Sequence, residues 1–210
     1  ERVIIPTGRQ RNRMWRRYCG FLDLTIDEFV DIQDHLLKEQ LSFIKSSEIA
    51  KHIATNVPET PAEFRDAIPL TTYADYREIL SKRDDSVLAV KPHTWAMTSG
   101  RGGEPKWVPY TETFIEHLAQ TSVAVVILAC AERHGDVQLR SGFRVLANLP
   151  SAPYMTGILN ELLAPVLGAR LIPPADAHGD DDFEAKIQEG FRIALVSGVD
   201  LLSSMTSVLV

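Results

Sequence analysis

The residues best suited to chemistry form one glycine-rich segment, Thr98-Ser99-Gly100-Arg101-Gly102-Gly103-Glu104-Pro105-Lys106, between two expected strands. Its glycines, Gly100, Gly102 and Gly103, allow the backbone to turn several N–H groups toward one point. Thr98 and Ser99 add hydroxyls, while Arg101 and Lys106 add positive charge. These groups together can cradle a polyphosphate, although a plain surface hairpin explains the same residues.

The segment is not a Walker A loop. That loop requires Gly-x-x-x-x-Gly-Lys-Ser/Thr, whereas here Pro105 precedes the lysine and Trp107 follows it. A P-loop NTPase is therefore excluded.

Other polar residues give weaker signals. Acidic side chains and His178 cluster within residues 176–184, but acids at a helix N-terminus explain them more simply than a divalent cation does. His93, His117 and His134 have no partner at the spacing of a metal site or a catalytic triad. We therefore predict no metal site.

The two cysteines, Cys19 and Cys130, lie far apart and form no Cys-x-x-Cys pair. Neither a disulfide framework nor a structural zinc site is indicated. A reducing compartment, and hence a cytoplasmic location, is the simpler expectation.

Charge and hydropathy exclude two classes of partner. The 22 Lys and Arg against 28 Asp and Glu give a net charge of −6, which disfavours a nucleic-acid-binding protein. The longest strongly apolar stretch, residues 123–131, is about half the length that a bilayer crossing requires, so we expect no membrane partner. Six arginines and one glutamate within residues 1–17 indicate either a solvated face of a first helix or a patch that docks a phosphate or a partner.

The front of the chain is expected to be helical. Thr25-Ile26-Asp27-Glu28 matches a capping box, and apolar residues then recur at helical spacing to about Lys45. Further helices are expected at residues 47–55, from Thr60-Pro61 onward, and at residues 73–80.

Strands and helices then alternate. Strands are expected at residues 87–90, 94–98, 107–108, 143–149, 169–172 and 199–202. Helices are expected from a cap at Thr113 to Ala131, at residues 157–167, where Pro165 should kink or end the helix, and at residues 181–196. This alternation favours an α/β fold with a mostly parallel βαβ sheet.

Two domain regions follow: a helical N-terminal region at residues 1–83 and an α/β region at residues 84–210. Because the chain closes on the apolar run Ser207-Val208-Leu209-Val210, we expect the α/β domain to be incomplete and to pack against the remainder of its own chain. Tyr154 and Gly157 follow a strand, at the carboxyl end where open α/β sheets bind ligands, and are candidates to line a substrate pocket.

The glycine-rich segment resembles the first ATP-binding signature of the acyl-adenylate-forming superfamily, Ser/Thr-Ser-Gly-Thr-Thr/Ser-Gly-x-Pro-Lys. The matching residues are Thr98, Ser99, Gly100, Gly103, Pro105 and Lys106. The flanks at residues 64–76, 149–157 and 191–195 are similar to plant auxin-responsive acyl-acid amido synthetases, the first of them also to phenylacetate-CoA ligase-like proteins. The resemblance covers about residues 60–210.

The resemblance implies that the intact protein uses MgATP to activate a carboxylic acid as an acyl-adenylate and passes the acyl group to an amine or to coenzyme A. It implies that the loop residues 98–103 hold the phosphates of ATP and that Lys106 stabilises the departing pyrophosphate. The superfamily's later segments Tyr-Gly-x-Thr/Ser-Glu and Thr-Gly-Asp are absent from these 210 residues. We therefore expect this fragment alone to be inactive.

Arg101 and Gly102 depart from the signature, because they occupy the positions of its hydroxyl pair. A guanidinium can bind phosphate in their place. The alternative is a degenerate phosphate loop, in which case the protein is a non-catalytic relative or an interaction module that docks a partner through its arginine-rich front end.

Overall fold

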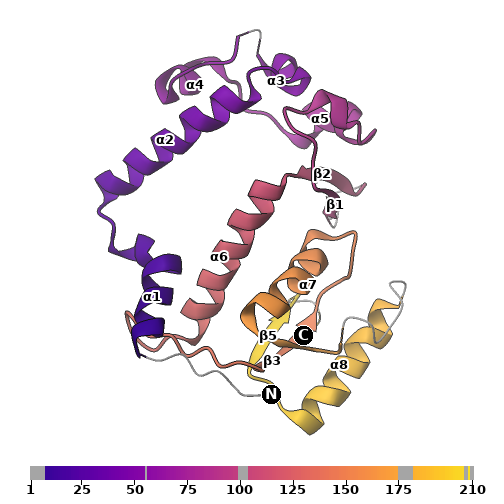
Figure 1. Cartoon of the computed structure of the whole chain (residues 1–210). Helices are drawn as coiled ribbons and strands as arrows, with labels where there is room; N and C mark the ends of the chain where they lie inside the picture. The colour runs from indigo at the N-terminus through magenta and orange to yellow at the C-terminus, as the bar shows by residue number, and fades with distance from the viewer. Residues whose placement is uncertain (1–7, 55, 99–103, 175–181, 206–207, 209–210) are drawn as a thin grey trace. The chain divides into compact units, whose positions relative to one another are not determined.

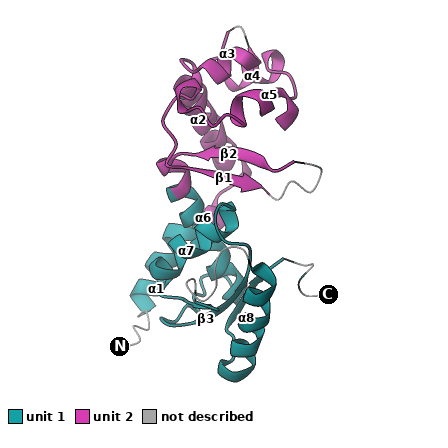
Figure 2. Ribbon diagram, turned by 90° about the vertical axis from the view of Figure 1, so that its right-hand side faces the viewer, with its two compact units in different colours: residues 1–20, 116–210 teal, residues 21–115 magenta. Residues whose placement is uncertain are grey.

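A computed structural model of the chain describes residues 8–54, 56–98, 104–174, 182–205 and 208 (Figure 1). Its contacts divide the chain into two compact units (Figure 2). Unit 1 comprises residues 1–20 and 116–210, and unit 2 comprises residues 21–115. Each unit is described by itself below.

A short 3₁₀ helix, η1 (Gly20–Asp23), spans the boundary at which unit 2 begins, and four α-helices of unit 2 follow. They are α2 (Ile26–Ile44), α3 (Glu48–Ile53), α4 (Pro61–Ala67) and α5 (Tyr73–Leu80), which confirms the expected helical front part of the chain.

Local capping fixes where two of these helices begin. Thr25 and Glu28 form the capping box predicted for α2, in which the Glu28 N–H donates to the Thr25 hydroxyl and the Thr25 N–H donates to the Glu28 carboxylate. Thr60 and Glu63 form the same box at α4, with Pro61 as its first residue. These signals involve residues three positions apart, which is why the sequence alone predicts them.

The strand expected at residues 87–90 is wrong. The segment instead contains a 3₁₀ helix, η2 (Asp85–Val87), followed by bends. The Asp84 carboxylate accepts hydrogen bonds from the backbone N–H and the hydroxyl of Ser86, which closes the chain into a turn. A polar cap therefore outweighs the apolar run of Val87 to Val90.

Strands β1 (Thr94–Thr98) and β2 (Lys106–Tyr110) form an antiparallel hairpin in unit 2. Both strands were expected, but as members of a mostly parallel sheet. The pairing places Thr98 opposite Lys106, so the glycine-rich loop closes directly on these two residues.

Helix α6 (Glu112–Cys130) links the hairpin to unit 1. It begins one residue before the predicted cap at Thr113, because the Thr111 hydroxyl accepts a hydrogen bond from the Phe114 N–H and is the actual cap. By length and composition α6 is long and apolar enough to cross a membrane, with a mean hydropathy of 1.5, whereas the expectation from the sequence considered only residues 123–131. Val123, Ala124 and Ile127 are buried in unit 1, but only 17% of the apolar window is buried, so the absence of a membrane partner stays a prediction.

Unit 1 contains a three-stranded parallel sheet in the order β4-β3-β5. Its strands are β3 (Arg144–Asn148), β4 (Arg170–Ile172) and β5 (Leu201–Ser204), and its other helices are α1 (Gly8–Tyr18), α7 (Met155–Leu167) and α8 (Phe183–Ser197). Pro165 lies inside α7, which ends at Gly168 in the left-handed conformation. The expected parallel βαβ arrangement is confirmed here.

Helices α7 and α8 cover opposite faces of this sheet (Figure 2). The connection from β3 through α7 leads to β4, and the connection through α8 leads back across β3 to β5. Right-handed crossovers in opposite directions place their helices on opposite faces. Gly190 of α8 accordingly packs against Leu146 and Asn148, whereas Gly157 of α7 shares a cavity with Ala147 and Leu149.

The core of unit 1 joins α1, α6 and the sheet. Its buried side chains are Trp15, Cys19, Val123, Ala124, Ile127, Val137, Leu139, Phe143 and Val145. The two units do not coincide with the two domain regions that the sequence predicts, with their boundary after residue 83. That division into a helical and an α/β region stays a prediction. The fold class is α/β with a helical N-terminal region, as expected.

Candidate functional site

The mouth of the glycine-rich loop is the strongest candidate site. Of the seven residues predicted to bind phosphate, the structure describes Thr98 and Lys106 and brings them together as the last pair of the β1–β2 hairpin. Both side chains are exposed. Ser99, Gly100, Arg101, Gly102 and Gly103 lie outside the described residues.

Tyr73, the first residue of α5, fixes the lysine end of the loop. Its hydroxyl accepts a hydrogen bond from the Trp107 N–H at 3.0 Å and donates one to the Trp107 carbonyl oxygen at 3.2 Å. The Lys106 ammonium lies 5.4 Å from the centroid of the Tyr73 ring, within cation–π range. Sequence reasoning missed this role, because 34 residues separate Tyr73 from Trp107.

Helix α5 is itself anchored at the end that carries Tyr73. The Asp75 carboxylate accepts hydrogen bonds from the N–H and the hydroxyl of Thr72, and these bonds lower the pKa of Asp75 below its usual value. Asp75 therefore stays ionised at neutral pH and holds the first turn of the helix.

Two further contacts stabilise the hairpin. The Arg83 guanidinium lies 4.5 Å from the centroid of the Trp107 ring, and the Trp95 indole N–H donates to the Asp85 carboxylate at 2.9 Å. Both contacts tie the hairpin to the segment between α5 and β1. The hairpin is thus held by aromatic side chains on both of its strands.

The carboxyl edge of the parallel sheet is the second candidate. The chain leaves β3 to form β4 on one side and then crosses back to form β5 on the other side, so the strand order reverses between β3 and β5. A cavity of about 20 Å³ lies instead at the carboxyl ends of β3 and β4, lined by Ala147, Leu149, Gly157, Asn160, Glu161, Leu171, Pro173 and Lys186. That volume holds about one water molecule.

Gly157 and Tyr154 have different positions at this edge. Gly157 lines the cavity, and a Cβ on it would collide with the Pro150 carbonyl oxygen. Tyr154 is the N-cap of α7, where its carbonyl oxygen accepts from the Gly157 and Ile158 N–H groups. Their role in a substrate pocket stays a prediction.

Lys186, which sequence reasoning also missed, secures the loop after β3. Its ammonium donates to the Ser151 hydroxyl at 2.9 Å and to the Leu149 carbonyl oxygen at 3.3 Å. Nearby, the Asn148 side chain is fully buried, and neither its oxygen nor its nitrogen has a hydrogen-bond partner among the described residues. The sheet edge therefore combines a buried amide with a positive charge.

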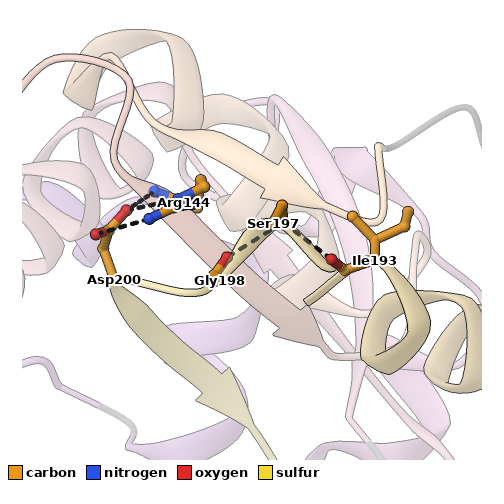
Figure 3. Close-up of polar contacts among 5 residues, drawn as sticks. All are labelled: Arg144, Ile193, Ser197, Gly198 and Asp200. Carbon is orange, nitrogen blue, oxygen red and sulfur yellow. Dashed lines mark hydrogen bonds and ion pairs between the residues drawn. The ribbon is translucent and has the colours of Figure 1, made fainter. Parts of the chain in front are cut away.

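At the opposite edge of the sheet, Arg144 and Asp200 join the starts of β3 and β5 (Figure 3). The Arg144 backbone N–H and Nε donate to one Asp200 carboxylate oxygen at 2.8 and 3.0 Å, and its Nη2 donates to the other at 3.3 Å. These bonds lower the pKa of Asp200 and raise the pKa of Arg144. The pair is structural, since it lies at the amino ends of the strands, whereas the candidate site of this sheet lies at their carboxyl ends.

The chemistry available at the loop is anion binding. Lys106 is an exposed cation with no carboxylate partner in the part of the chain that the structure describes, so its donor set fits a phosphate group. Within the same described part, no group of three His, Cys, Asp or Glu side chains could hold a metal ion. Of the acidic cluster within residues 176–184, residues 176–181 lie outside the description.

Comparison with known proteins gives one match. The family model of the GH3 family N-terminal domain matches residues 20–151, which include the hairpin and its loop. Neither the curated proteins nor the solved structures contain a match.

Proposed function

The chain belongs to the GH3 family of adenylate-forming acyl-acid amido synthetases, and from this premise we propose that its protein activates a carboxylic acid with ATP and transfers the acyl group to an amine. The observation that carries the proposal is the hairpin that places Thr98 and Lys106 at the mouth of the glycine-rich loop. Members of the family use amino acids as acceptors, so we favour an amine over coenzyme A.

In the proposed reaction ATP is a substrate whose phosphates bind the loop. We assign the β- and γ-phosphates to Thr98, Lys106 and the loop residues Ser99, Gly100, Arg101, Gly102 and Gly103. A carboxylate oxygen of the acid attacks the α-phosphorus, the bond to the bridging oxygen breaks, and pyrophosphate departs. The amine then attacks the acyl carbonyl carbon, loses a proton and displaces AMP.

Lys106 contributes electrostatically to the first step. Negative charge accumulates on the pyrophosphate as it leaves, and a fixed ammonium there stabilises the transition state more than the ground state. Mg²⁺ is part of the proposal for the whole protein, but the described residues contain no cluster of three His, Cys, Asp or Glu side chains that could hold it. No step is therefore assigned to the metal.

We also propose that the carboxylic acid approaches the carboxyl edge of the parallel sheet, near Tyr154 and Gly157. Support comes from the carboxyl edge of the parallel sheet, where open α/β sheets bind ligands, and from the cavity that Gly157 lines there. A cytoplasmic location is likewise proposed, since Cys19 is buried and free and Cys130 is also free.

Replacement of Lys106 tests the proposed function. In the full-length protein, Lys106→Ala should slow carboxylate-dependent ATP–pyrophosphate exchange by about tenfold or more, because a charge that stabilises the leaving group is lost. Lys91→Ala, which removes an exposed lysine of the same unit, is the matched control and should leave the exchange rate unchanged. Equal rates for Lys106→Ala and the wild type would remove the loop from the mechanism.

A non-catalytic interaction module is the second candidate, favoured by two observations. Arg101 and Gly102 replace the hydroxyl pair of the phosphate loop, and Arg9, Arg13 and Arg16 are exposed along α1. Titration of the full-length protein with ATP separates the candidates. Binding that Lys106→Ala weakens supports the enzyme, whereas no binding together with a complex formed through residues 9–17 supports the module.

A further inference from the structure

We propose that Tyr73 is a positioning residue that holds Lys106 in place for its contact with ATP, an inference that rests on the proposed function. The observation behind it is that one phenol side chain makes three contacts with two consecutive residues of β2. It forms two hydrogen bonds with the backbone of Trp107 and one cation–π contact with Lys106.

The two hydrogen bonds occupy the free edge of β2. Trp107 pairs with Met97 and Pro109 with Trp95, and Pro109 has no N–H to give to β1. Backbone groups two residues apart in a strand point to the same side, so the N–H and carbonyl of Trp107 also point away from β1. The Tyr73 hydroxyl satisfies both groups, as a third strand would.

The ring of Tyr73 acts on the side chain of Lys106. A lysine on an exposed strand end has four rotatable bonds and samples many positions. The ring face 5.4 Å from the ammonium restricts those positions to one side of the hairpin. Tyr73 therefore fixes the backbone next to Lys106 and limits where its charge can lie.

In the proposed reaction this placement matters because the ammonium must meet the phosphates as charge develops. A displacement of about 1 Å in a group that contacts the reacting centre can reduce the rate by about 100-fold. Tyr73 directly follows Thr72, whose N–H donates to the Asp75 carboxylate in the first turn of α5. Because this bond holds the start of the helix, α5 fixes the position of Tyr73.

Three variants separate the contributions. Tyr73→Phe keeps the ring and removes both hydrogen bonds to Trp107, and Tyr73→Leu removes the ring as well. Tyr76→Phe is the matched control on the same helix, because it removes only a hydrogen bond from the Tyr76 hydroxyl to the Thr71 hydroxyl. All three are made in the full-length protein, and thermal unfolding checks that each variant is folded.

Exchange kinetics give the main readout. We expect Tyr73→Phe to raise the KM for ATP about threefold to tenfold and Tyr73→Leu to raise it further, with little change in the KM for the carboxylic acid. Tyr76→Phe should leave both constants as in the wild type. A purely structural role for Tyr73 would instead lower the amount of active protein and leave both KM values unchanged.

A double-mutant cycle with Lys106→Ala shows whether Tyr73 acts through Lys106. The effect of Tyr73→Phe on ATP affinity, measured by calorimetry, should disappear when Lys106 is already alanine. An effect of equal size in both backgrounds would overturn the proposal. If Lys106→Ala changes the affinity for ATP but Tyr73→Phe does not, the positioning role of Tyr73 is wrong and the proposed function stands. If the full-length protein does not bind ATP at all, both the positioning role and the proposed function are wrong.

Discussion

The two units of the chain are stabilised in different ways. Unit 1 has a contiguous apolar core that joins α1, α6 and the sheet. Unit 2 buries few large side chains, and along α2 even Phe29, Ile32 and Leu36 are between 43% and 45% exposed. It relies on capping boxes and on side-chain hydrogen bonds to the backbone. Apolar packing thus dominates in unit 1, and helix capping and polar contacts dominate in unit 2.

The largest effect is expected from a cavity in the core of unit 1. Ile127 is fully buried, so Ile127→Ala should lower the free energy of unfolding by about 2–5 kcal/mol. Leu36→Ala in unit 2 removes a similar volume from a side chain that is 43% exposed and should cost less than about 1 kcal/mol. Urea denaturation of the full-length protein measures both, and equal losses would contradict the contrast between the units.

A close approach at the sheet edge of unit 1 should give the next largest effect. Gly157→Ala places a Cβ against the Pro150 backbone, and we expect a loss of about 1–3 kcal/mol in the free energy of unfolding. The matched control is Gly20→Ala, because nothing lies within 4 Å of a Cβ at that position. If both substitutions have the same small effect in thermal denaturation, the Pro150 backbone does not restrict the side chain at position 157.

Removal of a helix cap tests the local stabilisation of unit 2. Thr60→Ala deletes the hydroxyl that accepts from the Glu63 N–H and should destabilise α4 by about 1 kcal/mol. Thr113→Ala is the control, since Thr111 rather than Thr113 caps α6. Amide hydrogen exchange should rise in α4 for the first variant and stay unchanged in α6 for the second.

The smallest effect concerns pH and the Arg144–Asp200 pair. Because Arg144 lowers the pKa of Asp200 in the folded state, the pair stabilises unit 1 above the usual carboxyl pKa of about 3.9. This contribution is lost as the pH falls through the lower, folded-state pKa. The Asp200 side chain is 46% exposed, so solvent screening limits the contribution to below about 1 kcal/mol.

Asp200→Asn tests this pH dependence. The difference between wild type and variant in the midpoint of urea unfolding should be constant between pH 5 and 7 and shrink below about pH 4. If this difference in midpoint stays constant down to pH 2, the charge of Asp200 does not contribute to the stability of the folded state.

The sequence predicts elements whose signals are local. The capping boxes at Thr25 and Thr60 fixed the starts of α2 and α4, and the bounds of α5 were predicted to the residue. The wrong strand at residues 87–90 shows the limit, because the turn there depends on a hydrogen bond from Ser86 to Asp84 that apolar periodicity does not register. For the glycine-rich segment the sequence offered a plain surface hairpin, which is the antiparallel pairing that β1 and β2 adopt, although the alternation of strands and helices had assigned both strands to a mostly parallel sheet.

The candidate site was only partly predictable. The glycine-rich segment identified Thr98 and Lys106 by residue type and spacing, and the structure pairs them. Tyr73, Arg83 and Lys186 could not be found in this way, because their contacts with Trp107, Ser151 and Leu149 join residues far apart in sequence. Such contacts depend on how α5 and α8 pack, which no local pattern contains.

The outer edge of β2 has a consequence for the solubility of the protein. A strand at the margin of a small sheet can pair with a strand of another molecule, which starts aggregation. Here the Tyr73 hydroxyl occupies the N–H and carbonyl of Trp107, and Pro109 offers no N–H two residues further on. The tyrosine and the proline therefore leave little of the outer edge of β2 on which a second chain could pair.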